Sequence, residues 1–545
     1  MSAKKISRGV VLIGASLLWC SCTGEPGSSG NPGTAGGGAG GAGVGGTTGS
    51  GGTTGTGGGA GTTGSGGSSS SKGGAPAGSG GTVSGTGGAG GQGGAGTAGT
   101  GGSGQMAGAG AGAGGVGGAA GTTGRGGATA GTGGSGPRGG AGGTGGSSSA
   151  GSGGSATGGG SGGLPGSYGT ENTGADCPAP PAPPAFSALP SVMNLPDPFQ
   201  MTNGTRISKI ADWRCRRAEI ASQIQYWGSG PKGAPPMTET ATFSGGKLTV
   251  VVTQGSTSIT LTSTITTPSG AGPFPVVISM DGSGVPTSIF TNSGVATMDF
   301  TSSQLVPSAF SVTRGAGAYF SIYPDKNTGA MIEWAWGVSR LIDGLEKTAS
   351  QNKIDTKHIA VKGCSYAGKM ALYAGAFDER VALTIPEESG GGGEASWRFM
   401  ATQTGTEDLE AAQGTAWYAQ NLLQFKNKDA PKLPYDQHEL VAMIAPRAVL
   451  AIENTGIDRL GSQAGSVSMR AAKEVYKAMG IPDRLGYSQA QASAHCSFPS
   501  SQTADVQAFV DKFLLDKTSA NTNVAKDSYN TNLTTWITWS TPQLQ

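Results

Sequence analysis

The sequence from residue 176 to residue 545 predicts an α/β fold with a mostly parallel central sheet flanked by helices. Two observations support this class. Short apolar runs of strand length alternate with longer segments whose apolar residues recur at helical spacing. Helix-length segments also separate successive strands, which is the connection that parallel neighbours in a sheet require.

The first half of this region contains a strand pair, a buried strand and a helix. KLTVVVTQGSTSITLTSTITTP (247–268) alternates in polarity and is rich in Thr and Val, which is typical of paired strands. FPVVISMDG (274–282) is a short apolar run that ends in Asp-Gly, as buried strands often do. AMIEWAWGVSRLIDGLEK (330–347) places apolar residues at helical spacing with charges on the opposite side.

The second half continues this alternation of strands and helices. We expect the helix of 438–446 to stop at Pro446 and the helix of 468–480 to end at Gly480. The other elements are assigned from runs of strand length and from helical periodicity. The expected strands are 358–363, 381–389, 447–454 and 485–490, and the remaining helices are 369–378 and 503–515.

The N-terminal part of the chain has a different composition. Most of the 105 glycines precede residue 175, in irregular alternation with Ser, Thr and Ala. Collagen would need a strict three-residue period with abundant Pro, and so little apolar surface cannot offset chain entropy. Residues 23–175 are therefore predicted to be a disordered Gly-rich linker that tethers a single domain, 176–545.

Residues 1–22 have the pattern of an export signal. Basic residues (Lys4, Lys5 and Arg8) precede an apolar run of about ten residues, which is too short to span a bilayer. Cys20 or Cys22 is a candidate for lipid modification after cleavage. We expect the protein to be secreted or anchored at the cell surface, and to be a monomer. The formal net charge of +2 gives no indication of a nucleic-acid partner.

GCSYAG (363–368) is close to the G-x-S-x-G motif found where a strand turns sharply into a helix in α/β hydrolases. Ala367 stands where the second glycine is expected. The turn needs small neighbours because helix and strand backbones approach closely, and Ala367 is small. Ser365 is therefore a candidate nucleophile, and the alternative is a serine in an ordinary turn.

The base is sought among three histidines. His358 begins its strand at the opposite edge of the sheet from Ser365, and His438 opens a helix. His495 follows the last strand, which fits the chain order nucleophile, acid, base. Two carboxylates, Glu388 and Asp458, follow strands and could orient the imidazole of His495. The sequence leaves the choice between them open.

Four cysteines remain after the signal, an even number that is typical of two disulfides in an exported chain. Three pairings are allowed. A Cys364–Cys496 bond would hold its Cα atoms about 4.4–6.8 Å apart and so bring Ser365 and His495 together. Cys177 would then pair with Cys215. The alternative is that Cys364 and Cys496 are buried free thiols.

Several longer stretches resemble the glucuronoyl esterases, carbohydrate esterase family 15. They follow the family's order across nearly all of 177–545, and this combination is more specific than the serine motif alone. The stretches are LPDPF (195–199), DWRCRRAEI (212–220), GCSYAGKMAL (363–372), IPEESGGGGEASWR (385–398), LPYDQHELVAMIAPRAVLAIEN (433–454) and AHCSFPSSQ (494–502).

The resemblance implies an α/β-hydrolase fold and a serine esterase without metal or organic cofactor. Such an enzyme cleaves esters between (4-O-methyl-)glucuronic acid of glucuronoxylan and lignin alcohols through an acyl-enzyme. It further implies that the cysteines beside the serine and the histidine are joined. The implied roles are nucleophile for Ser365, base for His495, acid for Glu388 (or Asp458, a position that some bacterial members fill with an acid), and sugar contact for Lys369.

Some positions depart from the family pattern. Tyr366 replaces an arginine that helps to stabilise the oxyanion, so that its backbone N–H is the expected donor. Arg459 replaces a tryptophan that lines the sugar site. Gln403 is a candidate sugar-binding glutamine, with Glu410 or Gln413 as its open partner. Trp417 is either a wall of the site or a core residue.

These departures keep two other functions in view. One is a deacetylase-type carbohydrate esterase, which would act on acetylated xylan and not on alkyl glucuronates. The other is a tethered polysaccharide-binding protein with weak or lost catalysis, which Tyr366 suggests. Glycan binding without ester turnover would indicate the second.

Overall fold

The computed structural model describes residues 164–282, 284–325 and 327–545. In these residues the strands form one sheet in the order β1-β2-β3-β5-β4-β6-β7-β8-β9-β10. The strands are β1 (Thr238–Ser244), β2 (Lys247–Gln254), β3 (Thr257–Thr266), β4 (Phe274–Met280), β5 (Ala296–Phe300), β6 (Ile354–Cys364), β7 (Val381–Glu387), β8 (Ala448–Asn454), β9 (Leu485–Ala490) and β10 (Ala525–Lys526).

The sheet has an antiparallel edge and a parallel body. β1, β2 and β3 pair antiparallel, and β3 pairs antiparallel with β5. Every pair from β5 through β4 and β6 to β10 is parallel. The prediction of a mostly parallel sheet is confirmed, and in a parallel body the carboxyl ends of the strands meet at one edge, where ligands bind.

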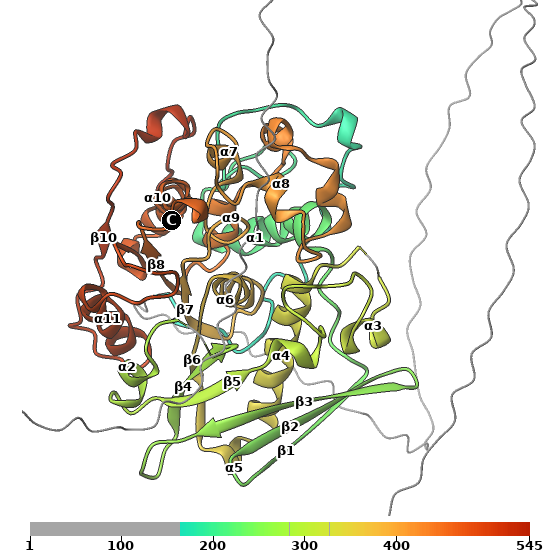
Figure 1. Cartoon of the computed structure of the whole chain (residues 1–545), viewed down its shortest axis with the longest axis vertical. Helices are drawn as coiled ribbons and strands as arrows, with labels where there is room; N and C mark the ends of the chain where they lie inside the picture. Colours follow the sequence, from blue (N-terminus) through green and yellow to red (C-terminus); the bar gives the residue numbers. More distant parts are fainter. Residues whose placement is uncertain (1–163, 283, 326) are drawn as a thin grey trace, which may run out of the picture. The chain divides into compact units, whose positions relative to one another are not determined.

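Helices cover both faces of this sheet (Figure 1). The α-helices are α1 (Ile210–Ile224), α2 (Thr287–Thr291), α3 (Ala318–Ile322), α4 (Ala330–Lys347), α5 (Ala349–Asn352), α6 (Tyr366–Phe377), α7 (Trp397–Met400), α8 (Leu409–Ala412), α9 (Gln437–Ala442), α10 (Ser462–Ala478) and α11 (Thr503–Phe513). α6 packs against α4 and α9, and α9 also contacts α1 and α10. On the other face α11 packs against α2, β7 and β8.

β4 shows how alternation in the sequence produces two cores. Val276 and Ile278 belong to the large apolar cluster beneath α4 and α6, whereas Val277 belongs to the cluster beneath α2 and α11. Successive side chains of a strand point to opposite faces, so an unbroken apolar run serves both layers. This burial fixes the strand register and with it the positions of the loops at the carboxyl edge.

Most predicted elements are present, with shifted ends. The helix of 330–347 has the predicted bounds. α10 begins at Ser462, before the predicted 468, because SQAGSV (462–467) is helical without a clear apolar period. α9 ends at Ala442, so the predicted helix of 438–446 is too long.

α1, β1, β5 and β10 were not predicted. α1 buries charged side chains instead of a simple apolar stripe, which hides its helical period. Arg216 pairs with Glu439 at 2.8 Å, and Arg217 pairs with Glu379 at 2.8 Å. Charges buried in this way must be paired, and their partners lie far away in the sequence, where local pattern reading does not detect them.

Composition places residues 164–175 in the linker, yet these residues contact the folded domain. The carboxylate of Glu171 pairs with Lys232 and with Arg340, each at 2.5 Å. The backbone N–H of Tyr168 donates to the carbonyl of Glu379 at 2.9 Å. The predicted signal of 1–22 and the linker up to residue 163 lie outside the described residues.

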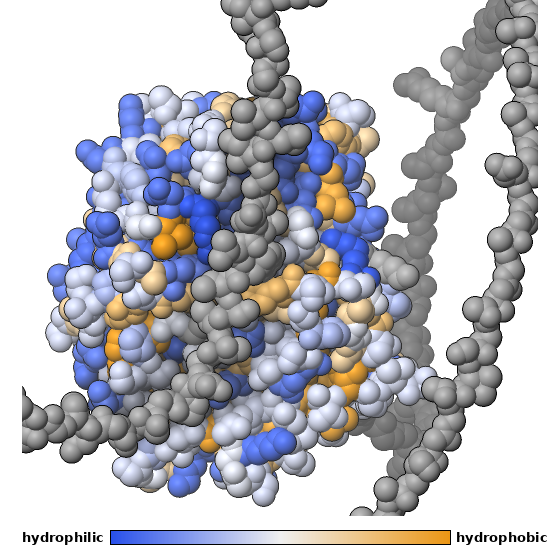
Figure 2. All heavy atoms as spheres, viewed as in Figure 1, coloured by the Kyte–Doolittle hydropathy of each residue, from blue (hydrophilic) through white to orange (hydrophobic). Residues whose placement is uncertain are grey.

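The face shown in Figure 2 carries hydrophobic residues in small separate groups among polar ones. The large hydrophobic side chains that are exposed in the described part of the chain come from several segments: Val192, Met193, Tyr226, Met237, Phe310 and Leu423. No helix within 164–545 is long and apolar enough to cross a bilayer.

Candidate active site

Ser365 stands at the sharp turn between β6 and α6. Its backbone has φ 62° and ψ −128°, a conformation that residues other than glycine adopt only under strain. The backbone N–H of Ser365 donates to the carbonyl of Glu387 at 2.9 Å. This geometry is typical of the nucleophile turn of an α/β hydrolase, which presents a serine hydroxyl above the carboxyl edge of the sheet.

The structure explains the late glycine of GCSYAG. A Cβ atom on Gly363 would lie 2.3 Å from the carbonyl oxygen of Ala367, and one on Gly368 would lie 2.5 Å from that of Glu387. Both contacts are with backbone, so neither position accepts a side chain without movement of the helix or the strand. The methyl group of Ala367 is buried and accommodated. Close approach therefore requires glycine at 363 and 368, and not at 367.

His495 and Glu388 meet at the same edge. Nδ1 of His495 lies 2.5 Å from Oε2 of Glu388, and the backbone N–H of Cys496 donates to the same oxygen at 3.0 Å. Glu388 directly follows β7, has φ 45°, and donates its own N–H to the carbonyl of Ile452 in β8 at 2.7 Å. Two neighbouring strands thus fix the carboxylate against the imidazole.

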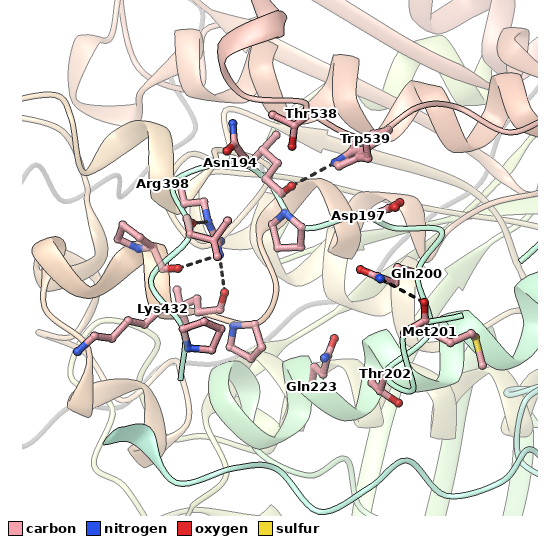
Figure 3. A pocket seen from close by; sticks show the side chains of 18 of the residues that line it. Asn194, Asp197, Gln200, Met201, Thr202, Gln223, Arg398, Lys432, Thr538 and Trp539 are labelled. Atoms are coloured by element: carbon pink, nitrogen blue, oxygen red, sulfur yellow. Dashed lines mark hydrogen bonds between the residues drawn. The ribbon is translucent and has the colours of Figure 1, made fainter. Parts of the chain in front are cut away.

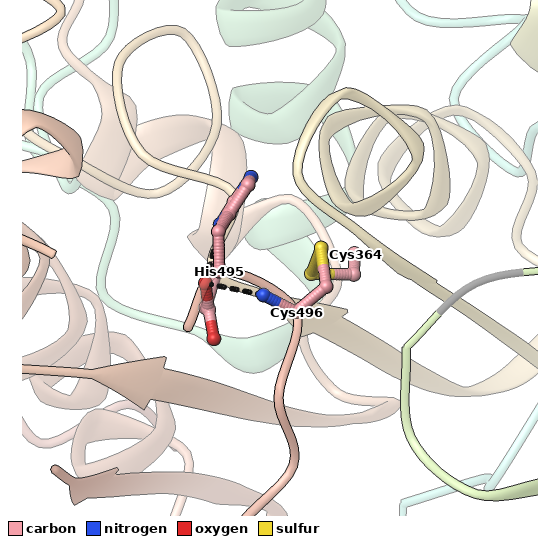
Figure 4. A group of neighbouring side chains, drawn as sticks. Cys364, His495 and Cys496 are labelled. Carbon is pink, nitrogen blue, oxygen red and sulfur yellow. Dashed lines mark hydrogen bonds and ion pairs between the residues drawn. A yellow bond between two sulfur atoms is a disulfide. The ribbon is translucent and has the colours of Figure 1, made fainter. Parts of the chain in front are cut away.

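A disulfide joins the two halves of this arrangement. Cys364 is bonded to Cys496 with the Cα atoms 5.8 Å apart (Figure 4). Ser365 follows Cys364 and His495 precedes Cys496, so the bond brings the serine turn and the histidine loop together. Nε2 of His495 is buried and has no hydrogen-bond partner in the described part of the chain. The second expected disulfide, Cys177–Cys215, is also present, with its Cα atoms 5.5 Å apart.

The other candidates for base and acid lie elsewhere. Nδ1 of His358 lies 2.7 Å from Asp355, and Nε2 of His438 lies 2.9 Å from the carbonyl of Pro196. Burial lowers the pKa of His438 to about 4. Asp458 is exposed at the start of a 3-10 turn, Asp458–Leu460. Of the two carboxylates that the sequence left open, the one bonded to His495 is Glu388.

Cys364, Glu388, His495 and Cys496 also form the group of possible metal ligands whose donor atoms lie within 4.8 Å of one another in the described residues. The two sulfur atoms are joined to each other, and metals bind thiolates. The imidazole and the carboxylate are bonded to each other as well. This group is built as an acid–base pair beside a disulfide and does not fit a metal ion.

Tyr366 is the first residue of α6 and lies next to Ser365. The first N–H groups of a helix have no partner within the helix and carry partial positive charge, so they can stabilise an anion. The phenol of Tyr366 donates to Oδ2 of Asp281 at 2.9 Å, and Asp281 also accepts bonds from the N–H and the hydroxyl of Ser302. Burial and the neighbouring charge of Asp281 raise the pKa of Tyr366.

Lys369 lies one turn further along α6 and is buried. Its Nζ pairs with Oε2 of Glu407 at 2.8 Å and lies 5.5 Å from the ring centre of Trp417. The backbone N–H of Glu407 donates to the carbonyl of Arg459 at 2.6 Å. Sequence reasoning missed Glu407, because it lies in a loop without a motif.

The remaining predicted sugar contacts have different surroundings. Trp417 is largely buried and stacks on Tyr366 with ring centres 6.2 Å apart, so it belongs to both the core and the wall. Nε2 of Gln403 lies 3.5 Å from Gln463. The side chain of Arg459 is exposed and makes no hydrogen bond or ion pair with other residues of the described range.

The two open partners for Gln403 have structural roles. The carboxylate of Glu410 accepts the backbone N–H of Asn427 at 3.0 Å. The side-chain amide of Gln413 donates to the carbonyls of Leu422 and Phe425. Both side chains hold the loop that carries Trp417, and neither pairs with Lys369.

Three more carboxyl groups are buried close to Glu388 in the fold. Burial and the charge of Glu388 raise the pKa of Glu387 to about 8, against a weaker opposing effect of Lys362. Burial also raises the pKa of Glu394, and burial together with Glu394 raises that of Glu453. With a pKa of about 8, Glu387 keeps its proton near neutral pH.

A separate hollow of about 580 Å³ lies between residues 190–204, α1, residues 431–434 and the segment of Trp539 (Figure 3). Arg398 lines it, and donates to the carbonyls of Leu433 and Tyr435. Neither Ser365 nor His495 lines this hollow. Its polar groups hold surface segments together, and it is not the site described above.

The parallel sheet, the strained serine turn and the imidazole–carboxylate pair at one edge define an α/β hydrolase. A sequence profile described as "Glucuronyl esterase, fungi" matches residues 250–480. A 4-O-methyl-glucuronoyl methylesterase of Podospora anserina is 37% identical over 366 residues, which cover 65% of this chain and 76% of the relative. The chain belongs to the glucuronoyl esterase family and is a carboxylic ester hydrolase.

Further relatives agree with this membership. A 4-O-methyl-glucuronoyl methylesterase of Cerrena unicolor is 39% identical over 379 residues, covering 66% of this chain and 78% of the relative. The solved catalytic domain of a glucuronoyl esterase from Hypocrea jecorina aligns with a TM-score of 0.63 and 39% identity, covering 67% of this chain and 100% of that domain. A Sporotrichum thermophile glucuronoyl esterase, solved with methyl 4-O-methyl-β-D-glucopyranuronate, aligns with a TM-score of 0.62 and 36% identity, covering 66% of this chain and 97% of that one.

Proposed function

We propose that the chain hydrolyses esters of (4-O-methyl-)glucuronic acid, with Ser365 as nucleophile, His495 as base and Glu388 as the acid that orients His495. The observation that carries this assignment is the 2.5 Å contact between His495 and Glu388, combined with the disulfide that ties their loop to the serine turn. The natural substrate class is the ester between glucuronoxylan and a lignin alcohol, in line with the family.

The chemistry follows from these positions as acyl transfer in two steps. Nε2 of His495 takes the proton of the Ser365 hydroxyl as its oxygen attacks the uronate carbonyl. The imidazolium returns that proton to the departing alcohol oxygen, which leaves the uronyl group on Ser365. Water then attacks the acyl-enzyme with the same base, and the uronic acid is released.

The oxyanion is stabilised by backbone instead of a charged side chain. The N–H of Tyr366 at the start of α6 is one donor. The phenol of Tyr366 is committed to Asp281 and does not replace the arginine of other members. We therefore expect a slower chemical step than in members that carry the arginine, since one lost oxyanion donor costs about 10²–10³ in kcat.

Lys369 and Glu407 are proposed to bind sugar hydroxyls on the acyl side. Their ion pair offers N–H donors and carboxylate acceptors side by side, and the backbone of Arg459 is bonded to Glu407. Because Glu407 already neutralises Lys369, the pair is suited to a neutral ester and does not retain the uronate anion after hydrolysis.

Hydrolysis of the benzyl ester of glucuronic acid by wild type and Ser365→Ala tests the function. We expect turnover by wild type and by a control, Ser500→Ala, at an exposed serine, and a loss of at least a thousandfold in Ser365→Ala. Equal rates in all three proteins would refute the assignment. Activity on acetylated xylan but not on the benzyl ester would instead identify a deacetylase, and glycan binding without any turnover a binding protein.

Export of the protein is proposed on two grounds. The predicted signal in residues 1–22 and the two disulfides both fit an oxidising compartment.

Lipid modification at Cys20 or Cys22 concerns residues outside the described range, and palmitate labelling of the Cys20→Ala and Cys22→Ala variants would test it. A monomeric state is proposed as well, with light scattering as its test.

A further inference from the structure

We infer that Asp281 is a positioning residue, which holds the backbone N–H of Tyr366 in place for the oxyanion by binding the phenol of Tyr366. The inference rests on the proposed function and concerns the same site. It adds a group that acts on the chemical step without touching the substrate. It starts from a set of hydrogen bonds that joins the carboxyl ends of three neighbouring strands.

Asp281 directly follows β4, the strand that lies between β5 and β6 in the sheet. Its Oδ2 accepts the phenol of Tyr366 at 2.9 Å and the hydroxyl of Ser302 at 2.6 Å, and its Oδ1 accepts the backbone N–H of Ser302 at 2.8 Å. Ser302 comes shortly after β5, and Tyr366 comes shortly after β6. One carboxylate therefore ties the ends of all three strands together beside the nucleophile.

The backbone on either side of these bonds is strained. Asp281 has φ 45° and Ser365 has φ 62°. Residues other than glycine keep such conformations only where the surrounding structure holds them. The peptide that links Ser365 to Tyr366 carries the N–H that is proposed to bind the oxyanion. Relaxation of Ser365 would rotate this peptide and turn its N–H away from the attacked carbonyl.

The ring of Tyr366 is the connection through which Asp281 acts on that peptide. It stacks on Trp417 with the ring centres 6.2 Å apart, and its centre lies 6.5 Å from that of Trp334. Trp334 is buried, and its Nε1 donates to the carbonyl of Ser302 at 3.2 Å. Packing limits the tilt of the phenol ring, and the bond to Asp281 fixes the far end of the ring. The peptide at the start of α6 is thereby held from its side chain.

The expected effect of losing this bond falls on kcat and not on KM. In the described part of the chain, Asp281 has no bond to Lys369 or Glu407, the pair proposed to contact the sugar. An oxyanion donor gains strength as charge develops in the transition state, so its misplacement slows chemistry without weakening the bound ester. The N–H is still present when the phenol is released, so the loss is smaller than the 10²–10³ that follows removal of a donor.

The test is a double-mutant cycle on the benzyl ester of glucuronic acid, with wild type, Asp281→Ala, Tyr366→Phe and the double variant. We expect each single variant to lower kcat about tenfold and to keep KM within twofold of wild type. The double variant should lose no more than either single variant, because both substitutions delete the same bond. The matched control is Tyr226→Phe, at a tyrosine that is 41% exposed, and its kcat should equal that of wild type.

The outcomes separate this inference from the proposed function. If the ester is hydrolysed and Tyr366→Phe keeps the wild-type kcat, or if the two losses multiply in the double variant, the positioning role is refuted and the esterase assignment stands. A faster Asp281→Ala would refute it too, since the charge of Asp281 would then oppose the oxyanion. If circular dichroism shows that Asp281→Ala is unfolded, Asp281→Asn replaces it in the cycle with the same expectation. If wild type does not hydrolyse the ester, the proposed function fails and the positioning role fails with it.

Discussion

The Nδ1 atom of His495 lies 2.5 Å from Oε2 of Glu388, although the two residues are 107 positions apart in the chain. Glu388 is fixed by a backbone bond to β8, and His495 by the disulfide of its neighbour Cys496 to Cys364. The contact therefore joins two separately anchored backbones. This is the arrangement needed to keep an imidazole in one tautomer and orientation during proton transfer.

Glu388→Gln is expected to lower kcat on the benzyl ester of glucuronic acid about 10³–10⁴-fold, because the amide favours the wrong tautomer of His495 and does not stabilise its charged form. Asp458→Asn should stay within twofold of wild type, because Asp458 is exposed and not bonded to His495. Steady-state kinetics of both variants measure this, with circular dichroism to verify folding. A comparable loss in Asp458→Asn would show that the exposed carboxylate takes part.

The two disulfides should differ in what their removal does. They close loops of 132 and 38 residues, so replacing either pair by alanines is expected to cost about 2–5 kcal/mol of unfolding free energy. Only Cys364→Ala/Cys496→Ala should also lower kcat, at temperatures where both variants are folded, because it frees the histidine loop from the serine turn. Calorimetry and kinetics at matched temperatures test this, and an equal kcat in the two variants would contradict it.

Gly368→Ala is expected to destabilise the protein by about 1–3 kcal/mol, because the added methyl would meet the carbonyl oxygen of Glu387 at 2.5 Å. The strain falls between α6, which follows Ser365, and β7, which precedes Glu388, so kcat should fall as well. The control is Ala367→Gly, which restores the usual motif and should cost only about 0.5–1 kcal/mol through chain entropy. Urea unfolding gives both values, and a larger cost for Ala367→Gly would refute the shifted-glycine interpretation.

The fold was predictable where local pattern and burial agree. The helix of 330–347 and the strand that precedes Ser365 follow directly from apolar spacing. α1 was missed because its buried face contains Arg216 and Arg217, whose partners Glu439 and Glu379 come from distant parts of the chain. Periodicity detects apolar burial and does not detect charges that are buried in pairs.

The candidate site shows the same division. The GCSYAG motif selects Ser365, and chain order selects His495 among the three histidines, while Glu388 and Asp458 stay equivalent until the strands are placed in space. Glu407 carries no local signal, since only the fold brings its loop onto Lys369. The role of Asp281 as acceptor for Tyr366 was likewise not predictable, because the loop after β4 is 85 positions from α6.

The buried carboxyl of Glu387 should make the unfolding free energy depend on pH. The residue is 1% exposed, and burial together with the charge of Glu388 raises the pKa of its carboxyl from 4.5 to about 8. Between these values the unfolded chain has released this proton and the folded protein keeps it. The unfolding free energy therefore falls as pH rises through this window, by up to about 1.4 kcal/mol per pH unit from this group, and levels off above it.

Glu387→Gln imitates the protonated carboxyl and removes this titration. The advantage of the variant over wild type should be smallest near pH 5 and should grow toward pH 8, because only the wild-type carboxyl must then stay protonated above its ordinary pKa. Urea unfolding of both proteins from pH 5 to pH 8.5 measures the difference, in which all other titrating groups cancel. A difference that stays constant over this range would show that the carboxyl of Glu387 is ionised in the folded protein.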